Sequence, residues 1–275
     1  APTGGSYRWY TTATGGNAIA GEAGASYTIP SINTTTTYYV AAVSSSGCES
    51  SRVAVEAKVI PALANNTISS DQIICSGAIP AQLSGTLPTG GEGTYTYAWE
   101  QSTDGTTFTS IAGAISQNYT PGALTADTWY RRKVTAGSTC SESISNTVKV
   151  TVSPMPSAPT ASDAVICEGA TATLSITSPN AAYTYRWYTA ETGGTLLASG
   201  AFYTTAAISA TTKYYVEALS AAGCISARTT VTVTVNAVPA APAVTGAERC
   251  GTGTLTLSAS GAPTGASYRW YTAAV

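Results

Sequence analysis

The sequence predicts an all-β protein built from tandem immunoglobulin-like β-sandwich domains strung end to end. Three observations predict this class: a tryptophan-centred phrase that recurs about every 87 residues, period-two alternation of Val, Thr and Tyr, and proline-bearing links between the repeats. A period near this length is too long for a solenoid repeat and suits a small β-domain repeated in tandem. Histidine is absent and charged residues make up only 9% of the chain, which excludes Ser-His-Asp catalysis and imidazole metal ligation.

The recurring phrase centres on one tryptophan per repeat. Its copies are Tyr7-Arg8-Trp9-Tyr10, Tyr97-Ala98-Trp99-Glu100, Tyr185-Arg186-Trp187-Tyr188 and Tyr268-Arg269-Trp270-Tyr271. A tryptophan at the same phase of every sandwich usually fills its core. We therefore expect Trp9, Trp99, Trp187 and Trp270 to be core residues.

Short strands in an antiparallel arrangement are expected within each repeat. In the third repeat they fall near residues 162–167, 171–177, 183–189, 195–198, 202–207, 212–219 and 228–235. Each run alternates or is bounded by Gly, Asn and Ser clusters, and no window has helical spacing. The Gly-rich segments 14–16 and 192–194 are expected to be hairpin turns, because no helix and no lysine follows to make them phosphate cradles.

Proline-bearing links separate the repeats at residues 60–62, 153–159 and 238–242. Such links stay extended and act as semi-rigid spacers. The expected organisation is a partial domain, two whole domains and a second partial domain, with the boundaries 1–60, 61–153, 154–236 and 237–275. Residues 1–60 begin at the tryptophan strand and residues 237–275 stop just after one. We therefore expect a window on a longer array that is cut in mid-domain at both ends.

The six cysteines fall into two phases. One class precedes the tryptophan of its repeat by 20 to 24 residues, and the other follows it by 37 to 41 residues; the classes are Cys75, Cys167 and Cys250, and Cys48, Cys140 and Cys224. One cysteine of each class per domain predicts the disulfides Cys75–Cys140 and Cys167–Cys224 and an oxidising, extracellular compartment. Cys48 and Cys250 remain as candidates for a bond between repeats or subunits. Without CxxC pairs or histidine, no metal site is expected.

No catalytic site is expected from the carboxylates. A glycosidase needs two of them at a defined separation in a cleft, whereas the candidates lie at different phases of different repeats; they are Asp71, Asp104, Asp127 and Asp163. A net charge of -2 and a pI near 5.1 give no field to attract nucleic acid. No apolar run approaches the roughly 20 residues that a membrane-spanning helix needs, so membrane insertion is not expected.

Several further phrases resemble a known family. Ser102–Phe108, Asn118–Leu124 and the Ile-Cys-x-Gly segments at 74–77 and 166–169, together with Tyr-Arg-Trp-Tyr-Thr, resemble immunoglobulin-like repeats of very large Bacteroidota cell-surface proteins. Those proteins are similar in kind to gliding-motility adhesins and other cargo of the type IX secretion system. The resemblance covers essentially the whole chain. It implies export to the cell surface and offers no catalytic residues to carry over. No cofactor is expected.

We therefore predict a non-enzymatic structural and adhesive repeat segment of a long extracellular surface protein or fibre. Its expected partners are neighbouring repeats or copies of the same chain end to end, with surface polysaccharide or other cells as a further class. One alternative is a filament subunit whose half-domains are completed by neighbours, with Cys250 meeting Cys48 of the next copy, although the duplicated tryptophan strand argues against it. The other is an array of carbohydrate-binding modules, for which Trp129 is the best stacking candidate, although one aromatic ring is not a platform.

Overall fold

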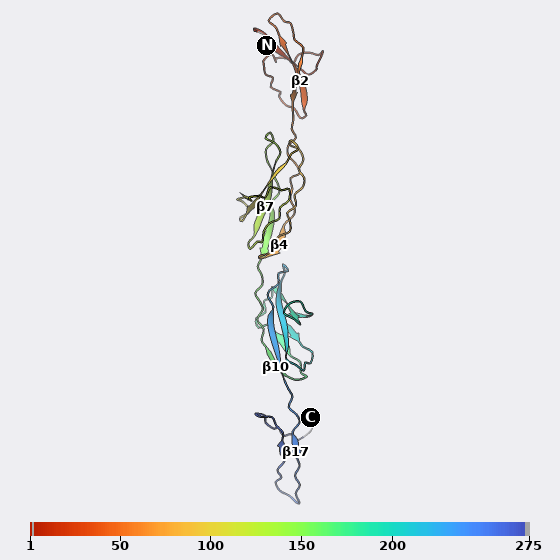
Figure 1. The fold of residues 1–275 in the computed structure, drawn as a ribbon, viewed down its shortest axis with the longest axis vertical. Helices are drawn as coiled ribbons and strands as arrows, with labels where there is room; N and C mark the ends of the chain where they lie inside the picture. Colours follow the sequence, from red (N-terminus) through yellow and green to blue (C-terminus); the bar gives the residue numbers. More distant parts are fainter. Residues whose placement is uncertain (2, 273–275) are drawn as a thin grey trace. The chain divides into compact units, whose positions relative to one another are not determined.

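The chain folds entirely into strands and loops. The computed structural model describes residue 1 and residues 3–272, and within this part there is no helix that could cross a membrane. The chain divides into two compact units, Ala1–Val152 and Ser153–Val275, which Figure 1 shows as a succession of strand-and-loop regions. The all-β prediction is therefore confirmed.

The first unit begins with a three-stranded antiparallel sheet. Its strands are β1 (Ser6–Tyr10), β2 (Thr36–Val43) and β3 (Val53–Ala57), and their order in the sheet is β1-β2-β3. Trp9 pairs with Val40, and Tyr38 pairs with Val55. The glycines after β1, Gly15 and Gly16, have φ values of +64° and +69°, which only glycine adopts without strain.

A six-stranded sheet follows in the same unit, with the order β4-β9-β7-β5-β6 and with β8 beside β7. Its strands are β4 (Gln72–Cys75), β5 (Thr96–Ser102), β6 (Thr109–Ser110), β7 (Thr128–Thr135), β8 (Ser143–Ile144) and β9 (Val148–Ser153). Strand β7 alternates between buried and half-buried residues along its whole length, which is the period-two pattern of a strand with one face in the core. Trp99, Leu83 and Tyr130 fill that core together with Val148 and Val150.

The second unit contains a five-stranded sheet in the order β10-β16-β15-β12-β13, and the pair β11-β14 lies over its core. The strands are β10 (Ala164–Cys167), β11 (Thr173–Ser175), β12 (Tyr183–Tyr188), β13 (Leu196–Ser199), β14 (Phe202–Thr204), β15 (Thr212–Ser220) and β16 (Thr229–Asn236). The structure corrects one expectation, because β10 and β16 are parallel. They are the first and last strands of the region, so no hairpin joins them and their directions are free to agree.

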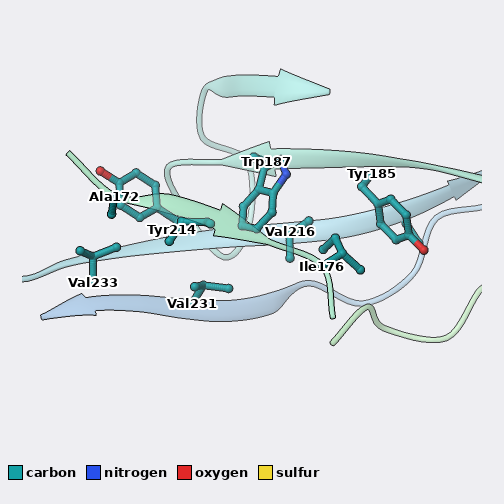
Figure 2. Packing of buried hydrophobic residues seen from close by; sticks show 10 residues of the cluster. Ala172, Ile176, Tyr185, Trp187, Tyr214, Val216, Val231 and Val233 are labelled. Carbon is teal, nitrogen blue, oxygen red and sulfur yellow. The ribbon is translucent and has the colours of Figure 1, made fainter. Parts of the chain in front are cut away.

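Tryptophan lies at the centre of this core. Figure 2 shows Trp187 above the strands that carry Val216 and Val231, with Tyr185 and Tyr214 on either side. Trp187, Val216 and Val231 are all fully buried. Burying one such aliphatic side chain contributes about 1.5–3 kcal/mol, so the alternation that predicted these strands also identifies the residues that stabilise them.

The last described segment, residues 237–272, contains only the short antiparallel pair β17 (Ala243–Thr245) and β18 (Ser258–Ser260). Trp270 is 57% exposed there, whereas Trp9, Trp99 and Trp187 are at most 9% exposed. The expectation of a core residue therefore does not hold at Trp270. In residues 154–236 the equivalent tryptophan is covered by β14, β15 and β16, and residues 237–272 contain no counterpart of these strands.

An aromatic ladder recurs in the three regions that do have a core. In each, a tyrosine stands between the core tryptophan and the first tyrosine of the long strand that pairs with the tryptophan strand, with neighbouring ring centroids 5.4 to 6.1 Å apart. Tilted and edge contacts at these separations are the favoured geometry of aromatic pairs. The three ladders are Trp9-Tyr27-Tyr38, Trp99-Tyr119-Tyr130 and Trp187-Tyr203-Tyr214.

Candidate functional site

The two cysteine classes occupy opposite ends of a repeat. In residues 154–236, Cys224 lies in the turn between β15 and β16, and its sulfur is 4.0 Å from the carbonyl oxygen of Ser153, where the chain enters the region. Cys167 ends β10 and pairs with Asn236, the last residue of β16, where the chain leaves the region. We call these the leading end and the trailing end of a repeat.

This placement corrects the expected disulfides. Strand β16 separates Cys224 from Cys167, and its eight residues span about 26 Å at 3.3 Å per residue. A disulfide needs Cα atoms within about 7 Å, so the pair Cys167–Cys224 cannot form within one repeat. The described residues contain four free thiols, at Cys48, Cys140, Cys167 and Cys250. Cys75 and Cys224 are disulfide-bonded.

The same geometry bears on the two remaining candidates. Cys48 precedes β3 just as Cys224 precedes β16, so it belongs to a leading end, and it is exposed. Cys250 is the counterpart of Cys167 by sequence and is also exposed. If residues 237–275 and 1–60 of two copies completed one repeat, these cysteines would lie at its opposite ends. A Cys250–Cys48 bond across such a repeat is therefore disfavoured by the length of the sheet.

The aspartates bind backbone amides rather than form a catalytic pair. Asp71 accepts the amide of Lys149 and Asp163 accepts that of Thr232, each at 2.8 Å. Both stand four residues before a cysteine of the trailing end, so the expectation that they lie at different phases was wrong for this pair. Each fastens the first strand of its repeat to the last.

The other two aspartates are also engaged locally. Asp127 accepts the amide of Val152 at 2.8 Å and pairs with the ammonium of Lys149 at 2.7 Å. Asp104 accepts the amides of Thr106 and Thr107, and these bonds hold its pKa far below the usual value. The described residues contain no group of three or more His, Cys, Asp or Glu side chains that could hold a metal ion.

An arginine clamp closes the glycine-rich turn in two regions. The guanidinium of Arg228 lies 3.5 Å from the ring centroid of Tyr188 and donates to the carbonyl oxygens of Ala190 and Gly193, both at 2.7 Å. Arg228 also pairs with Glu217 at 3.0 Å. One guanidinium thus provides donors for two backbone carbonyl oxygens of the turn and for the carboxylate of Glu217. The equivalent Arg52 lies 3.3 Å from the Tyr10 ring centroid and donates to the carbonyl oxygens of Thr12 and Gly15.

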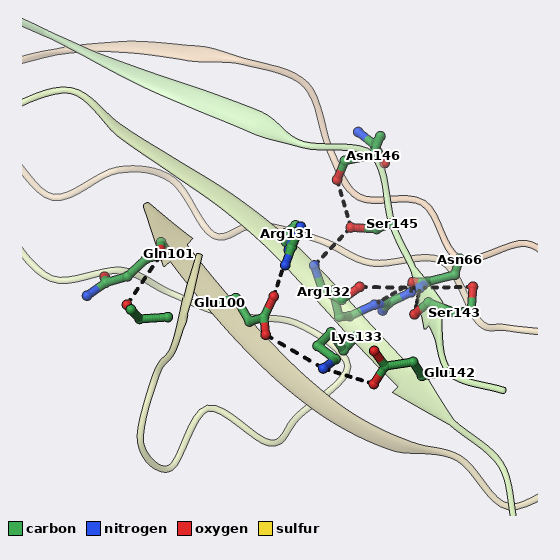
Figure 3. A network of polar contacts seen from close by, with 11 residues as sticks. Asn66, Glu100, Gln101, Arg131, Arg132, Lys133, Glu142, Ser143, Ser145 and Asn146 are labelled. Carbon is green, nitrogen blue, oxygen red and sulfur yellow. Dashed lines mark hydrogen bonds and ion pairs between the residues drawn. The ribbon is translucent and has the colours of Figure 1, made fainter. Parts of the chain in front are cut away.

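Residues 61–153 replace the clamp with a wider charged network, which Figure 3 shows. Arg131 pairs with Glu100 at 2.6 Å, and Lys133 bridges Glu100 and Glu142 at 3.8 and 2.8 Å. On the opposite face of the same strand, Arg132 is completely buried, and no carboxylate in the described part of the chain pairs with it. Desolvation lowers its pKa.

Carbonyl oxygens surround that buried guanidinium. Arg132 donates to Asn66 Oδ1 at 2.9 and 3.0 Å, to the carbonyl oxygen of Thr86 at 2.8 Å and to that of Gln117 at 2.9 Å. Gly85 leaves room for it, because a Cβ there would stand 1.8 Å from Arg132 Nη1. A buried charge persists only when its hydrogen-bonding capacity is met, so three separate loops are tied to one side chain.

Trp129 does not offer an open stacking face. It is half-buried, its ring lies 3.2 Å from where a Cβ of Gly105 would be, and the ammonium of Lys149 lies 4.9 Å from its ring centroid. The ring therefore packs against the Ser102–Phe108 turn as part of the domain.

Sequence reasoning missed the middle tyrosines of the ladders and the clamp arginines. Both have a signal in the sequence. Each middle tyrosine is followed by threonine, at Tyr27, Tyr119 and Tyr203. Each clamp arginine stands four residues after a leading-end cysteine, at Cys48 and Cys224. No comparable signal marks Arg132, because a charged residue in a strand is ordinarily placed on the solvent face.

Several solved structures resemble the chain at low sequence identity. Titin domains A168–A170 share 15% identity over 84% of this chain and 88% of theirs, with a TM-score of 0.40. The fibronectin(III)-like modules of Clostridium thermocellum CbhA share 16% over 62% of this chain and 94% of theirs, with a TM-score of 0.36. Domains 3–5 of the Drosophila OTK extracellular region share 13% over 84% and 85%, also with a TM-score of 0.36. No curated protein matches the chain.

Most of the chain matches two families of domains. Residues 64–154 match a domain of unknown function, DUF8696. Residues 1–61 and 156–236 match the family described as "Ig-like domain CHU_C associated", and these two ranges together make up slightly more than half of the chain. The chain therefore belongs to the family of CHU_C-associated Ig-like domains.

Proposed function

We propose that this chain is a structural and adhesive repeat segment of an extracellular, cell-surface protein, and that it works by spacing and contact rather than by catalysis. The observation that carries the proposal is the internal use of its polar side chains. The four aspartates bind backbone amides of their own regions, and the clamp arginines bind their own turns. Such side chains build a scaffold, because these aspartates and arginines are already engaged within their own regions.

The cysteines support an extracellular compartment. Cys75 and Cys224 are disulfide-bonded, and structural disulfides persist in oxidising, extracytoplasmic surroundings. On the resemblance described above, we propose export to the surface of a Bacteroidota cell by the type IX route. We further propose that 61–153 and 154–236 are whole repeats, that 1–60 and 237–275 are parts of two more, and that neighbouring repeats are partners end to end.

The test replaces the repeats rather than removing them. An antibody against residues 61–236 is applied to intact cells of the natural source, and in a second strain this range is exchanged for two unrelated Ig-like domains of equal length. A spacer role predicts surface labelling in the parent strain and undiminished attachment to polysaccharide or to other cells in the exchange strain. An adhesive role predicts that the exchange strain remains on the surface but loses attachment to polysaccharide or to other cells. Absence of labelling on intact cells, with labelling after lysis, would contradict the proposal.

One observation favours the filament alternative enough to test it. Val55 and Trp270, whose counterparts Val231 and Trp187 are fully buried, are 41% and 57% exposed. A filament of subunits and one long chain can be distinguished by the mass of material from the natural source. The mass is measured under denaturing, non-reducing conditions and again after reduction. A ladder that collapses to about 28 kDa on reduction would favour subunits, and a large mass unchanged by reduction would favour one long chain.

A further inference from the structure

Strand β3 has an unused edge. It pairs with β2 on one side, and among the described residues no strand pairs with the other side. Its apolar residues Val53 and Val55 are 62% and 41% exposed. An exposed edge of this kind presents unpaired N–H and C=O groups that can accept an added strand.

The complete repeat at 154–236 shows what such an edge accepts. Arg52 and Arg228 make the same clamp, which aligns Val55 with the fully buried Val231 and Ile60 with Asn236. The edge of β16 is occupied by β10 in parallel, and Cys167 lies opposite Asn236. A strand added to β3 in the same register would place its cysteine opposite Ile60.

The free thiol of Cys140 lies beside that position. Ile60 lines a pocket of about 380 Å³ together with Ala62, Leu63 and residues 139–143. Within it, the free and half-buried Cys140 has its sulfur 3.7 Å from the carbonyl oxygen of Pro61. The thiol therefore faces the linker at the point where the added strand would end.

We propose that the free edge of β3 binds, in parallel, a strand with the chemistry Ala-x-Ile-Cys-x-Gly, and that Cys140 forms a disulfide with the cysteine of that strand. Cys75 and Cys224 support this assignment, because they occupy the same two phases in their repeats and both are disulfide-bonded. Joining the two thiols transfers two electrons and two protons to a small disulfide such as oxidised glutathione, which leaves as two thiols. The proposal concerns the partner of one edge and does not depend on the surface role.

The experiment uses the whole chain and a peptide with the sequence of residues 162–169, Ser-Asp-Ala-Val-Ile-Cys-Glu-Gly, supplied as its mixed disulfide with glutathione. A protein thiolate attacks the peptide sulfur and glutathione leaves. The adducts are counted by intact mass and assigned by peptide mapping. Exposure alone predicts labelling of the exposed Cys48, Cys167 and Cys250 before the half-buried Cys140. Strand addition predicts instead that Cys140's share of the labelling is about tenfold higher with the peptide than with glutathione disulfide alone. A tenfold change corresponds to about 1.4 kcal/mol.

Matched controls separate strand addition from simple reactivity. A scrambled peptide with the cysteine in the same place is expected to lose the enrichment, and Cys140→Ser to abolish it. Val55→Asp places a charge where the buried Val231 stands in the complete repeat and should reduce the enrichment, whereas Val53→Asp, aligned with the half-buried Thr229, should retain it. Glutathione labelling of Cys140 in each variant reports whether the pocket is intact. Equal labelling by native and scrambled peptides, or labelling in proportion to exposure, would overturn the proposal.

Discussion

The central strands of residues 61–153 and of residues 154–236 differ at one buried position. Strand β7 carries Arg132 opposite Trp99, and β15 carries Val216 opposite Trp187, and all four residues are fully buried. The valine needs only apolar neighbours. The arginine needs acceptors, which three loops supply. One strand position can therefore be filled by packing or by hydrogen bonding, and the choice determines how tightly the surrounding loops are held.

The largest effect is expected when the hydrogen bonds of the buried Arg132 are removed. Arg132→Ala removes the guanidinium and leaves Asn66 Oδ1 and the carbonyl oxygens of Thr86 and Gln117 without this donor. We expect a loss of about 3–5 kcal/mol, because each buried acceptor left unsatisfied costs about 1–3 kcal/mol, whereas Val216→Ala should cost about 2 kcal/mol. Hydrogen exchange followed by mass spectrometry reports each region separately. Faster exchange confined to β7 in one variant and to β15 in the other is the expected result, and equal losses would contradict the comparison.

Gly85 tests the space around the same side chain. Gly85→Ala would put a Cβ 1.8 Å from Arg132 Nη1 and 2.7 Å from the carbonyl oxygen of Gln117, so the network must move. Overpacking of this kind costs about 1–3 kcal/mol. Gly122 is the control, because its φ is not positive and no atom lies within 4 Å of an added Cβ. A denaturant midpoint lowered by Gly85→Ala and unchanged by Gly122→Ala is expected; equal midpoints would contradict the role of Gly85.

Alkaline pH tests the aromatic ladders. Burial raises the pKa of Tyr130 to about 12 and raises that of Tyr214 in the same direction. An unfolded tyrosine ionises near pH 10, so the stability that the neutral ring provides is complete below about pH 10 and is lost as the pH rises through 12. Tyrosinate absorbance and tryptophan fluorescence should change together over this range. Tyr130→Phe should flatten the pH dependence of residues 61–153, and an unaltered profile would contradict this.

The smallest effect concerns a feature that the two regions share. Asp71→Ala and Asp163→Ala each remove one bond to a backbone amide between the first and last strands. Each should cost about 1 kcal/mol, and the two losses should be equal. Hydrogen exchange at Lys149 and Thr232 measures them. A loss in only one region would show that the shared contact has different roles.

The sequence predicted those parts of the molecule that depend on local pattern. Alternation places Trp187 and Val231 in the core, and the glycines after each tryptophan strand predict turns. The disulfide partners were not predictable, because spacing gives the phase of Cys224 and Cys167 but not the end of the sheet on which each lies. Arg132 was missed because its acceptors lie 15, 46 and 66 positions away in the sequence. All but one of them belong to backbone carbonyls, which carry no sequence signal.

The parallel pairing of β10 with β16 has a mechanical consequence. The chain enters residues 154–236 ahead of β10 and leaves them after β16, and both strands run toward the trailing end. Tension applied to the two ends of this region pulls β10 and β16 in opposite directions along their common axis. The hydrogen bonds between them are then loaded together in shear instead of being opened one at a time. Strands β10 and β16 therefore bear the load together, and the region resists extension until the hydrogen bonds between them break at the same time.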